Sequence, residues 1–271
     1  MRTVYLVVFA GFLLLKHVSA QENLDDGTNG LAVSFGAGHI SISDPVFTPL
    51  IYRGTGFLTD ISYASRQVKR KHSVTMSMTK STLRPVLSEA SMHTITTTGG
   101  FLHYTYQRNI KQSKWDCYLG GGIYTFASLR SLTIGSNEEV GWDLFSSVNV
   151  VASFNRTLHE KHDIELTVSY PLAAYVVGKM RIPKDFPEEA FLDFADDESA
   201  VPAGAILKSG DLLTMNKFVD VVTSVIYRLH FSGRFSAQAT YRFRYYQYPK
   251  ELNVKYGTSQ FLAGFFYSFR K

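Results

Sequence analysis

Cysteine is nearly absent from this chain: Cys117 is the only one among 271 residues. No intrachain disulfide can form, so a disulfide-stapled secreted fold is excluded. Cys117 also lies far from the N-terminus and therefore cannot carry an N-terminal lipid. If the chain is exported, its stability must come from elsewhere, and a closed β-sheet would provide it.

Long hydrophobic runs are absent beyond the N-terminus. Residues 1–20 combine Arg2, an apolar run from Val4 to Leu15 and the small-residue stretch Val18-Ser19-Ala20. This pattern predicts a secretory signal peptide cleaved before Gln21; an uncleaved N-terminal anchor is the alternative. No later segment approaches about 18 consecutive apolar residues, so no transmembrane helix is expected. Barrel strands carry a much weaker signal each, which leaves a membrane location open.

A strong excess of one charge is also lacking. The chain has 28 Lys and Arg residues against 23 Asp and Glu, a net charge of +5. Removal of Arg2 and Lys16 with the signal peptide leaves 26 basic and 23 acidic residues, or +3. So small and evenly spread a charge does not indicate a nucleic-acid partner, and none is expected.

The chain does contain repeated segments of alternating character, rich in Val, Ile, Thr, Tyr and Phe. Such alternation predicts β-strands. Most of the segments exceed the roughly 9–11 residues that a tilted strand needs to cross a membrane. We count ten of them, at 30–37, 51–66, 71–80, 94–108, 114–129, 140–155, 162–178, 215–230, 234–248 and 254–269.

The connections between these segments alternate in length. Four short ones read "QVKR", "NIKQS", "RTLHEK" and "FSGR". The others include "GHISISDPVFTPL", "STLRPVLSEASMH", "LRSLTIGSNEE" and the long stretch from Lys179 to Thr214; the one near "PKE" is short. An even number of strands with short turns at one end and longer loops at the other is typical of outer-membrane barrels.

The two faces of each segment differ in polarity. Within 215–230 one face carries Val219, Val221, Val225 and Tyr227, and the opposite face carries Asp220, Ser224 and Arg228. Segments 140–155, 162–178 and 234–248 alternate in the same way. Aromatic side chains concentrate on the apolar faces, several of them near the short turns, where a membrane interface favours them.

The last strand carries the most specific pattern. Phe265, Tyr267 and Phe269 lie two residues apart and share one strand face. This ending resembles the C-terminal strand signature of Gram-negative outer-membrane β-barrels. The resemblance implies recognition by the barrel-assembly machinery and contact with outer-membrane lipid and lipopolysaccharide. Arg270 and Lys271 follow the terminal aromatic residue, which departs from the pattern, and we expect both in the periplasm.

Together these features predict an all-β fold, a single-chain antiparallel transmembrane β-barrel with ten strands; eight or twelve remain open because two segments are short. The domain boundaries are a signal peptide at 1–20 and the barrel at 21–271.

Charged residues on the polar faces are expected inside the barrel. They are Asp60, Glu165, Asp220, Arg228, Arg242 and Arg244. A three-residue hairpin over Phe231-Ser232-Gly233, symmetric about Ser232, would place Asp220 opposite Arg244. Because a buried unpaired arginine is costly, a carboxylate partner is expected. The network is structural in one interpretation and an ion-selective constriction in the other.

No catalytic, cofactor-binding or metal-binding residues are assigned. Ten-stranded omptin proteases use paired aspartates with a His–Asp couple at the outer rim, and no matching arrangement occurs here. His230 and Ser232 lie close in sequence but at the short-turn end, which is wrong for a lipid A deacylase. The glycine runs match no complete phosphate-binding fingerprint.

One long connection is strongly acidic. It could bind Ca²⁺ through carboxylate oxygens, but it lacks EF-hand spacing, and charge runs are usually solvated. Its length suggests a functional extracellular loop. Its carboxylates are Asp185, Glu188, Glu189, Asp193, Asp196, Asp197 and Glu198.

Three functions follow for such a barrel. We favour a non-enzymatic outer-membrane protein with a polar, largely filled lumen, acting in envelope structure or through loop-mediated binding. The alternatives are a narrow, porin-like channel for ions or small solutes, and a rim enzyme acting on lipid or peptide. A soluble secreted β-sandwich is disfavoured, since its aromatic faces would be exposed.

Overall fold

The computed structural model describes residues 28–45, 48–87, 93–112, 114–134, 137–159, 161–177, 210–248 and 254–269. These residues form eleven strands: β1 (Thr28–Asp44), β2 (Thr48–Arg66), β3 (Arg70–Pro85), β4 (His93–Lys111), β5 (Asp116–Ile134), β6 (Asn137–His159), β7 (His162–Val177), β8 (Asp211–Thr214), β9 (Val219–His230), β10 (Phe235–Tyr248) and β11 (Val254–Phe269). No helix in these residues is long and apolar enough to cross a membrane.

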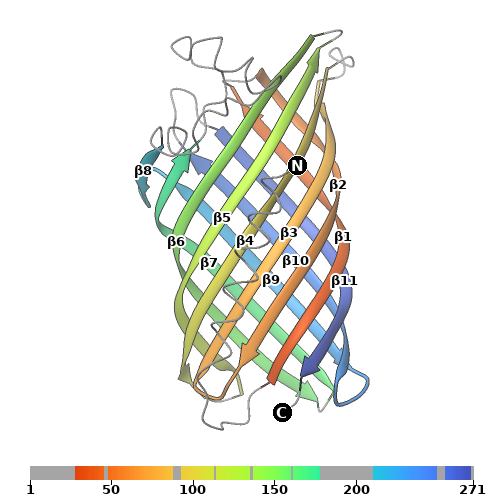
Figure 1. Ribbon diagram of the computed structural model, residues 1–271, viewed down its shortest axis with the longest axis vertical. Helices are drawn as coiled ribbons and strands as arrows, with labels where there is room; N and C mark the ends of the chain where they lie inside the picture. The colour runs from red at the N-terminus through yellow and green to blue at the C-terminus, as the bar shows by residue number, and fades with distance from the viewer. Residues whose placement is uncertain are drawn as a thin grey trace, which may run out of the picture.

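Ten of these strands form a closed antiparallel barrel (Figure 1), which confirms the predicted fold class. The ten barrel strands pair in chain order from β1 to β7, β7 then pairs with β9 past the inserted β8, and β9, β10 and β11 again pair in order. β1 and β11 close the barrel in a register that runs from Asn29–Phe269 to Ser43–Lys255. Among the described strands, the extra strand β8 pairs only with the end of β7.

Side chains alternate between lumen and outer surface along each strand. On β10, Arg242 and Arg244 are buried, whereas Tyr241 and Phe243 are exposed. On β11, Phe261, Phe265 and Phe269 are exposed on the outer surface, and Tyr267 packs between Phe235 and Phe269 at ring-centroid distances of 4.9 and 5.1 Å. The outward aromatic residues of the last strand therefore belong to an apolar outer surface.

That apolar surface covers the other strands too. Its exposed side chains include Leu31, Val33, Phe35, Phe57, Ile61, Met78, Leu119, Ile123, Val148, Val150 and Leu172. Closure of the sheet pairs the backbone groups of all ten barrel strands, which is the condition for a sheet surrounded by hydrocarbon.

Two connections are much shorter than the sequence predicted. β1 continues to Asp44 and β2 begins at Thr48, so most of "GHISISDPVFTPL" is strand. Likewise β5 ends at Ile134 and β6 begins at Asn137 within "LRSLTIGSNEE", and these two strands project beyond the others at the top of Figure 1. The predicted loops were wrong here because the strands continue past the end of the outer apolar surface. Their inward side chains still pack in the lumen, where Ile40, Ile42 and Leu132 are fully buried.

Three predictions fall outside the described residues. They concern the signal peptide at 1–20, the acidic connection from Asp185 to Glu198, and the terminal residues Arg270 and Lys271.

An arginine placed on the outer surface should reveal whether lipid surrounds it. Val33 faces outward near the middle of the apolar surface, while Ser259 lies on the same surface beyond Phe261. Val33→Arg should lower the free energy of unfolding by about 2–4 kcal/mol, and Ser259→Arg by about 1 kcal/mol or less, since the penalty falls toward the interface. Urea unfolding in lipid vesicles measures both. Equal effects would argue against a membrane around these strands.

Candidate functional site

The lumen holds a series of ion pairs, beginning near the short turns. Glu165 on β7 accepts a hydrogen bond from Lys71 Nζ at 2.5 Å, and Arg228 Nη1 lies 3.6 Å from its other carboxylate oxygen. Thr167 Oγ1 donates to Glu165 at 3.2 Å. Strands β3, β7 and β9 are thus tied together across the lumen by one carboxylate.

The next ion pair lies farther from the short turns. Arg242 on β10 pairs with Asp60 on β2 and donates to Gln260 Oε1 at 3.2 Å. Its guanidinium carbon lies 4.9 Å from the centre of the Phe101 ring. A guanidinium over an aromatic face gains a cation–π attraction that is larger when the charge is desolvated.

Arg244 occupies the centre of an aromatic cage. Its Nε and Nη2 donate to the two carboxylate oxygens of Asp220 at 2.9 and 3.2 Å, a bidentate arrangement. Four rings surround the guanidinium at 4.2–5.3 Å from its carbon, contributed by Tyr124, Phe126, Phe145 and Tyr246. Both charges are buried, so each depends on the other for compensation.

A third buried arginine lies closest to the long connections. Arg130 on β5 contacts Asp143 and, at 3.1 Å, Asp44. Tyr246 and Tyr248 donate their hydroxyl groups to Asp143 at 3.2 and 2.9 Å. Arg130 can neutralise only one of its two carboxylate neighbours. The hydrogen bonds from the two tyrosines therefore stabilise the negative charge of Asp143.

Apolar side chains fill the lumen at the level of Arg130 and Arg244. The cluster includes Ile40, Ile42, Tyr52, Leu83, Ile95, Tyr124, Phe126, Leu132, Phe145, Phe218, Tyr246, Tyr248, Val254 and Tyr256. Most of these residues lie near the strand ends that meet the long connections. This end of the lumen is therefore packed like a protein core.

The exposure of the ion pairs falls along the lumen, with the exception of Lys71, which is 5% exposed near the short turns. At the short-turn end, the side chains of Arg66 and Asp116 are 34% and 32% exposed. Arg228 and Glu165 are 17% and 12% exposed, and Arg242 and Asp60 are each 8%. Arg130 and Asp44 are each 1% exposed. Solvent thus reaches the lumen from the short-turn end, and the opposite end is closed.

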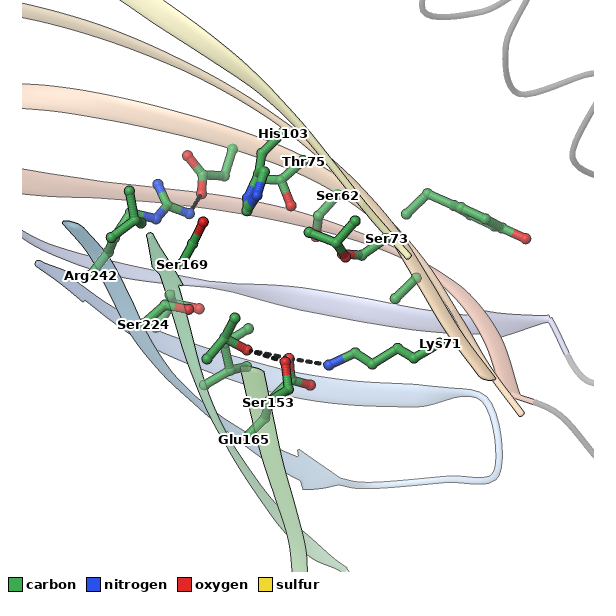
Figure 2. Close-up of a pocket in the computed structure, with 18 of the residues that line it drawn as sticks. Ser62, Lys71, Ser73, Thr75, His103, Ser153, Glu165, Ser169, Ser224 and Arg242 are labelled. Atoms are coloured by element: carbon green, nitrogen blue, oxygen red, sulfur yellow. Dashed lines mark hydrogen bonds and ion pairs between the residues drawn. The ribbon is translucent and has the colours of Figure 1, made fainter. Parts of the chain in front are cut away.

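A polar cavity of about 90 Å³ lies between the closed end and the short turns. Hydroxyl side chains dominate its wall, among them Ser62, Ser73, Thr75, Ser153, Ser169 and Ser224 (Figure 2). Asp60 Oδ1 and His103 Nε2 are buried and have no hydrogen-bond partner among the described protein atoms. The volume and polarity suit several water molecules.

The structure places all six expected lumen charges inside the barrel, but with a different register. Tyr246, and not Arg244, is the partner of Asp220 in the β9–β10 ladder, and Arg244 is opposite Val222. The hairpin centre is Gly233 instead of Ser232, because His230 pairs with Ser236. The length of the arginine side chain spans the two-residue offset.

Sequence reasoning overlooked Lys71 and Arg130. Lys71 belongs to an expected strand but borders a turn, where a lysine usually faces solvent. Arg130 lies in the stretch expected to be a loop, so its inward orientation had no strand register to reveal it. Continued alternation through Leu129, Arg130 and Ser131 is the signal that marks it in retrospect.

A hydrogen-bonded chain near the short turns contains the residue types of a hydrolase triad. Ser236 Oγ lies 2.7 Å from His230 Nδ1, and His230 Nε2 lies 2.8 Å from Asp163 Oδ2. Ser236 is buried, however, and neighbouring backbone N–H groups belong to the sheet ladder, leaving no oxyanion hole beside the serine. Ser232 instead accepts backbone N–H groups of its own turn. These hydrogen bonds among Asp163, His230 and Ser236 join strands β7, β9 and β10.

Potential metal ligands are scattered in the part of the chain that the structure covers. No group of three or more His, Cys, Asp and Glu side chains in those residues is arranged to hold an ion.

No family model matches this sequence, and no curated protein matches it. Solved barrels match its fold. The outer membrane protease OmpT from Escherichia coli has 7% sequence identity and a TM-score of 0.51, covering 92% of this chain and 99% of its own. The translocator domain of the autotransporter NalP from Neisseria meningitidis has 12% identity and a TM-score of 0.46, covering 99% and 98% of the two chains. At such identities the likeness shows the barrel fold alone.

Proposed function

We propose that this chain is an integral outer-membrane barrel whose lumen is closed by its own side chains and which neither conducts nor catalyses. In this role it is exported by the segment 1–20 and inserted with its short turns in the periplasm. The continuous apolar outer surface supports the membrane location, since a soluble monomer rarely exposes an apolar patch of more than a few hundred Å². The fold likeness to an outer membrane protease agrees with it.

The observation that carries the proposal is the packed end of the lumen. The rings around Arg244, the Arg130 cluster and the aliphatic residues beside them fill this end, and the cavity in the lumen has a volume of only about 90 Å³. Ten strands enclose little space once large side chains point inward, whereas aqueous channels are found in barrels of about 16–18 strands.

Function would then lie outside the lumen, in envelope structure or in binding through the long connections. The acidic stretch from Asp185 to Glu198 is the sequence feature that favours loop-mediated binding. We further propose that Phe265, Tyr267 and Phe269 serve as the assembly signal, and that outer-membrane lipid and lipopolysaccharide surround the barrel.

Planar-bilayer recordings test this proposal. Refolded protein that migrates differently on gels before and after boiling should insert without a steady conductance, because the aromatic and arginine layers block ions. A steady conductance, with an ion preference changed by Arg242→Gln, would instead establish the narrow channel. Identical migration of boiled and unboiled samples, with a form soluble without detergent, would refute the membrane barrel itself.

A further inference from the structure

Two arginines face each other on the outer surface of the barrel near the short turns. Arg70 begins β3, Arg108 lies near the end of β4, and the two are direct partners in the β3–β4 ladder. Both side chains are exposed. The next residue on β3, Lys71, and the preceding residue on β4, Gln107, are buried in the lumen, so the alternation along each strand directs both arginines outward. Like charges directly opposite on one sheet face repel each other. An anion between them would remove that repulsion.

The residues beside the pair mark a membrane interface. Arg108 Nε donates to the Tyr106 hydroxyl at 3.2 Å, and the Tyr106 ring lies 4.8 Å from that of His72. Farther along the same outer surface the cross-strand pairs become apolar, as in Val74–Tyr104 and Met76–Leu102. The order from apolar through aromatic to basic follows the passage from hydrocarbon to headgroups.

The surrounding turns add positive charge. Five further cations near the short turns are exposed, namely Lys69, Lys111, Lys114, Lys161 and Arg234. The described carboxylates at this end are all paired: half-buried Asp116 with Arg66, half-buried Asp163 with His230, and lumen-facing Glu165 with Lys71 and Arg228. Glu160 lies outside the described residues. No salt bridge within the described ranges involves Arg70 or Arg108. The field at this interface therefore favours an anionic group.

We propose that Arg70 and Arg108 bind the phosphate of an anionic phospholipid in the leaflet that borders the short turns. Two guanidinium groups can present paired N–H donors to phosphate oxygens, a geometry that lysine does not offer. The Tyr106 hydroxyl holds Arg108 in place, and the nearby lysines raise the local concentration of anionic lipid. This inference rests on the proposed membrane location.

Native mass spectrometry of the detergent-solubilised barrel measures the binding. The protein is mixed with equal amounts of dioleoyl-phosphatidylglycerol and dioleoyl-phosphatidylcholine, and the retained lipids are compared. We expect several-fold preferential retention of phosphatidylglycerol, decreasing as the salt concentration rises. Arg70→Gln combined with Arg108→Gln should bring the preference close to one.

The matched control is Lys217→Gln with Lys255→Gln, which removes two exposed cations at the opposite end of the barrel. It should retain the wild-type preference. Three outcomes overturn the site: no preference in the wild type, equal loss in the control, or displacement of the lipid by inorganic phosphate, which would indicate a simple anion site. All variants are first tested for the boiling-dependent gel shift. Failure of that shift in the wild type refutes the membrane barrel, whereas a normal shift without lipid preference refutes only the lipid site.

Discussion

Asp220→Asn should lower the free energy of unfolding by about 3–5 kcal/mol, because it leaves a buried charge without its counter-charge. Arg244 would remain enclosed by four aromatic rings with no carboxylate to neutralise it. Urea unfolding in lipid vesicles measures the change. Arg66→Gln is a suitable comparison: its ion pair with Asp116 is about one-third exposed, and such pairs contribute about 1 kcal/mol or less.

The double variant separates pairing from simple loss of stability. Asp220→Asn combined with Arg244→Gln should be less destabilised than Asp220→Asn alone, since neither buried charge remains. The coupling energy follows from the two single variants and the double variant. Strict additivity would mean that the bidentate contact does not bind the two side chains energetically.

Removal of the aromatic obstruction should convert a silent barrel into a conducting one. Phe145 and Tyr246 pack edge to face with centroids 5.5 Å apart, and both contact the Arg244 guanidinium. Phe145→Ala with Tyr246→Ala removes two large rings from the closed end. We expect discrete openings in planar bilayers that the wild type lacks.

Large-to-small changes of this kind cost about 3–5 kcal/mol each, so Tyr246→Ala alone provides a milder variant. Only protein with a boiling-dependent gel shift is recorded. The control is Phe243→Ala with Phe261→Ala, which deletes two rings from the outer surface and should remain silent. Folded variants without openings would show that other residues close the lumen.

The elements most accessible from the sequence were those whose two faces differ in polarity. The segment predicted at 254–269 coincides with β11, and 234–248 differs from β10 by one residue. The inward orientation of Arg242 and the outward orientation of Phe243 followed from strand periodicity alone, because a one-residue change of register would exchange them. Where lipid requires apolar side chains and the lumen requires polar ones, the local alternation of the sequence is sufficient to predict which way each side chain points.

Contacts across the lumen were not accessible in this way. Lys71 reaches Glu165 from a strand that is not its neighbour in the sheet, and Asp60 meets Arg242 across the seam formed by β1 and β11. Such meetings depend on strand tilt and stagger, which are properties of the closed barrel. The extended β5–β6 hairpin was missed for a related reason, since its inner residues are buried by partners distant in sequence.

The pairing of β1 with β11 delays closure of the barrel until the last strand is available. Asn29 meets Phe269, so the ladder that closes the sheet joins the first described strand to the last. Contacts of such sequence separation form slowly, because chain entropy must be lost before any bond compensates for it. Until then β1 presents an unpaired edge, a template on which another chain can add. Aggregation during biogenesis should thus compete most strongly before the final strand is in place, and shortening β11 should shift that competition toward aggregates.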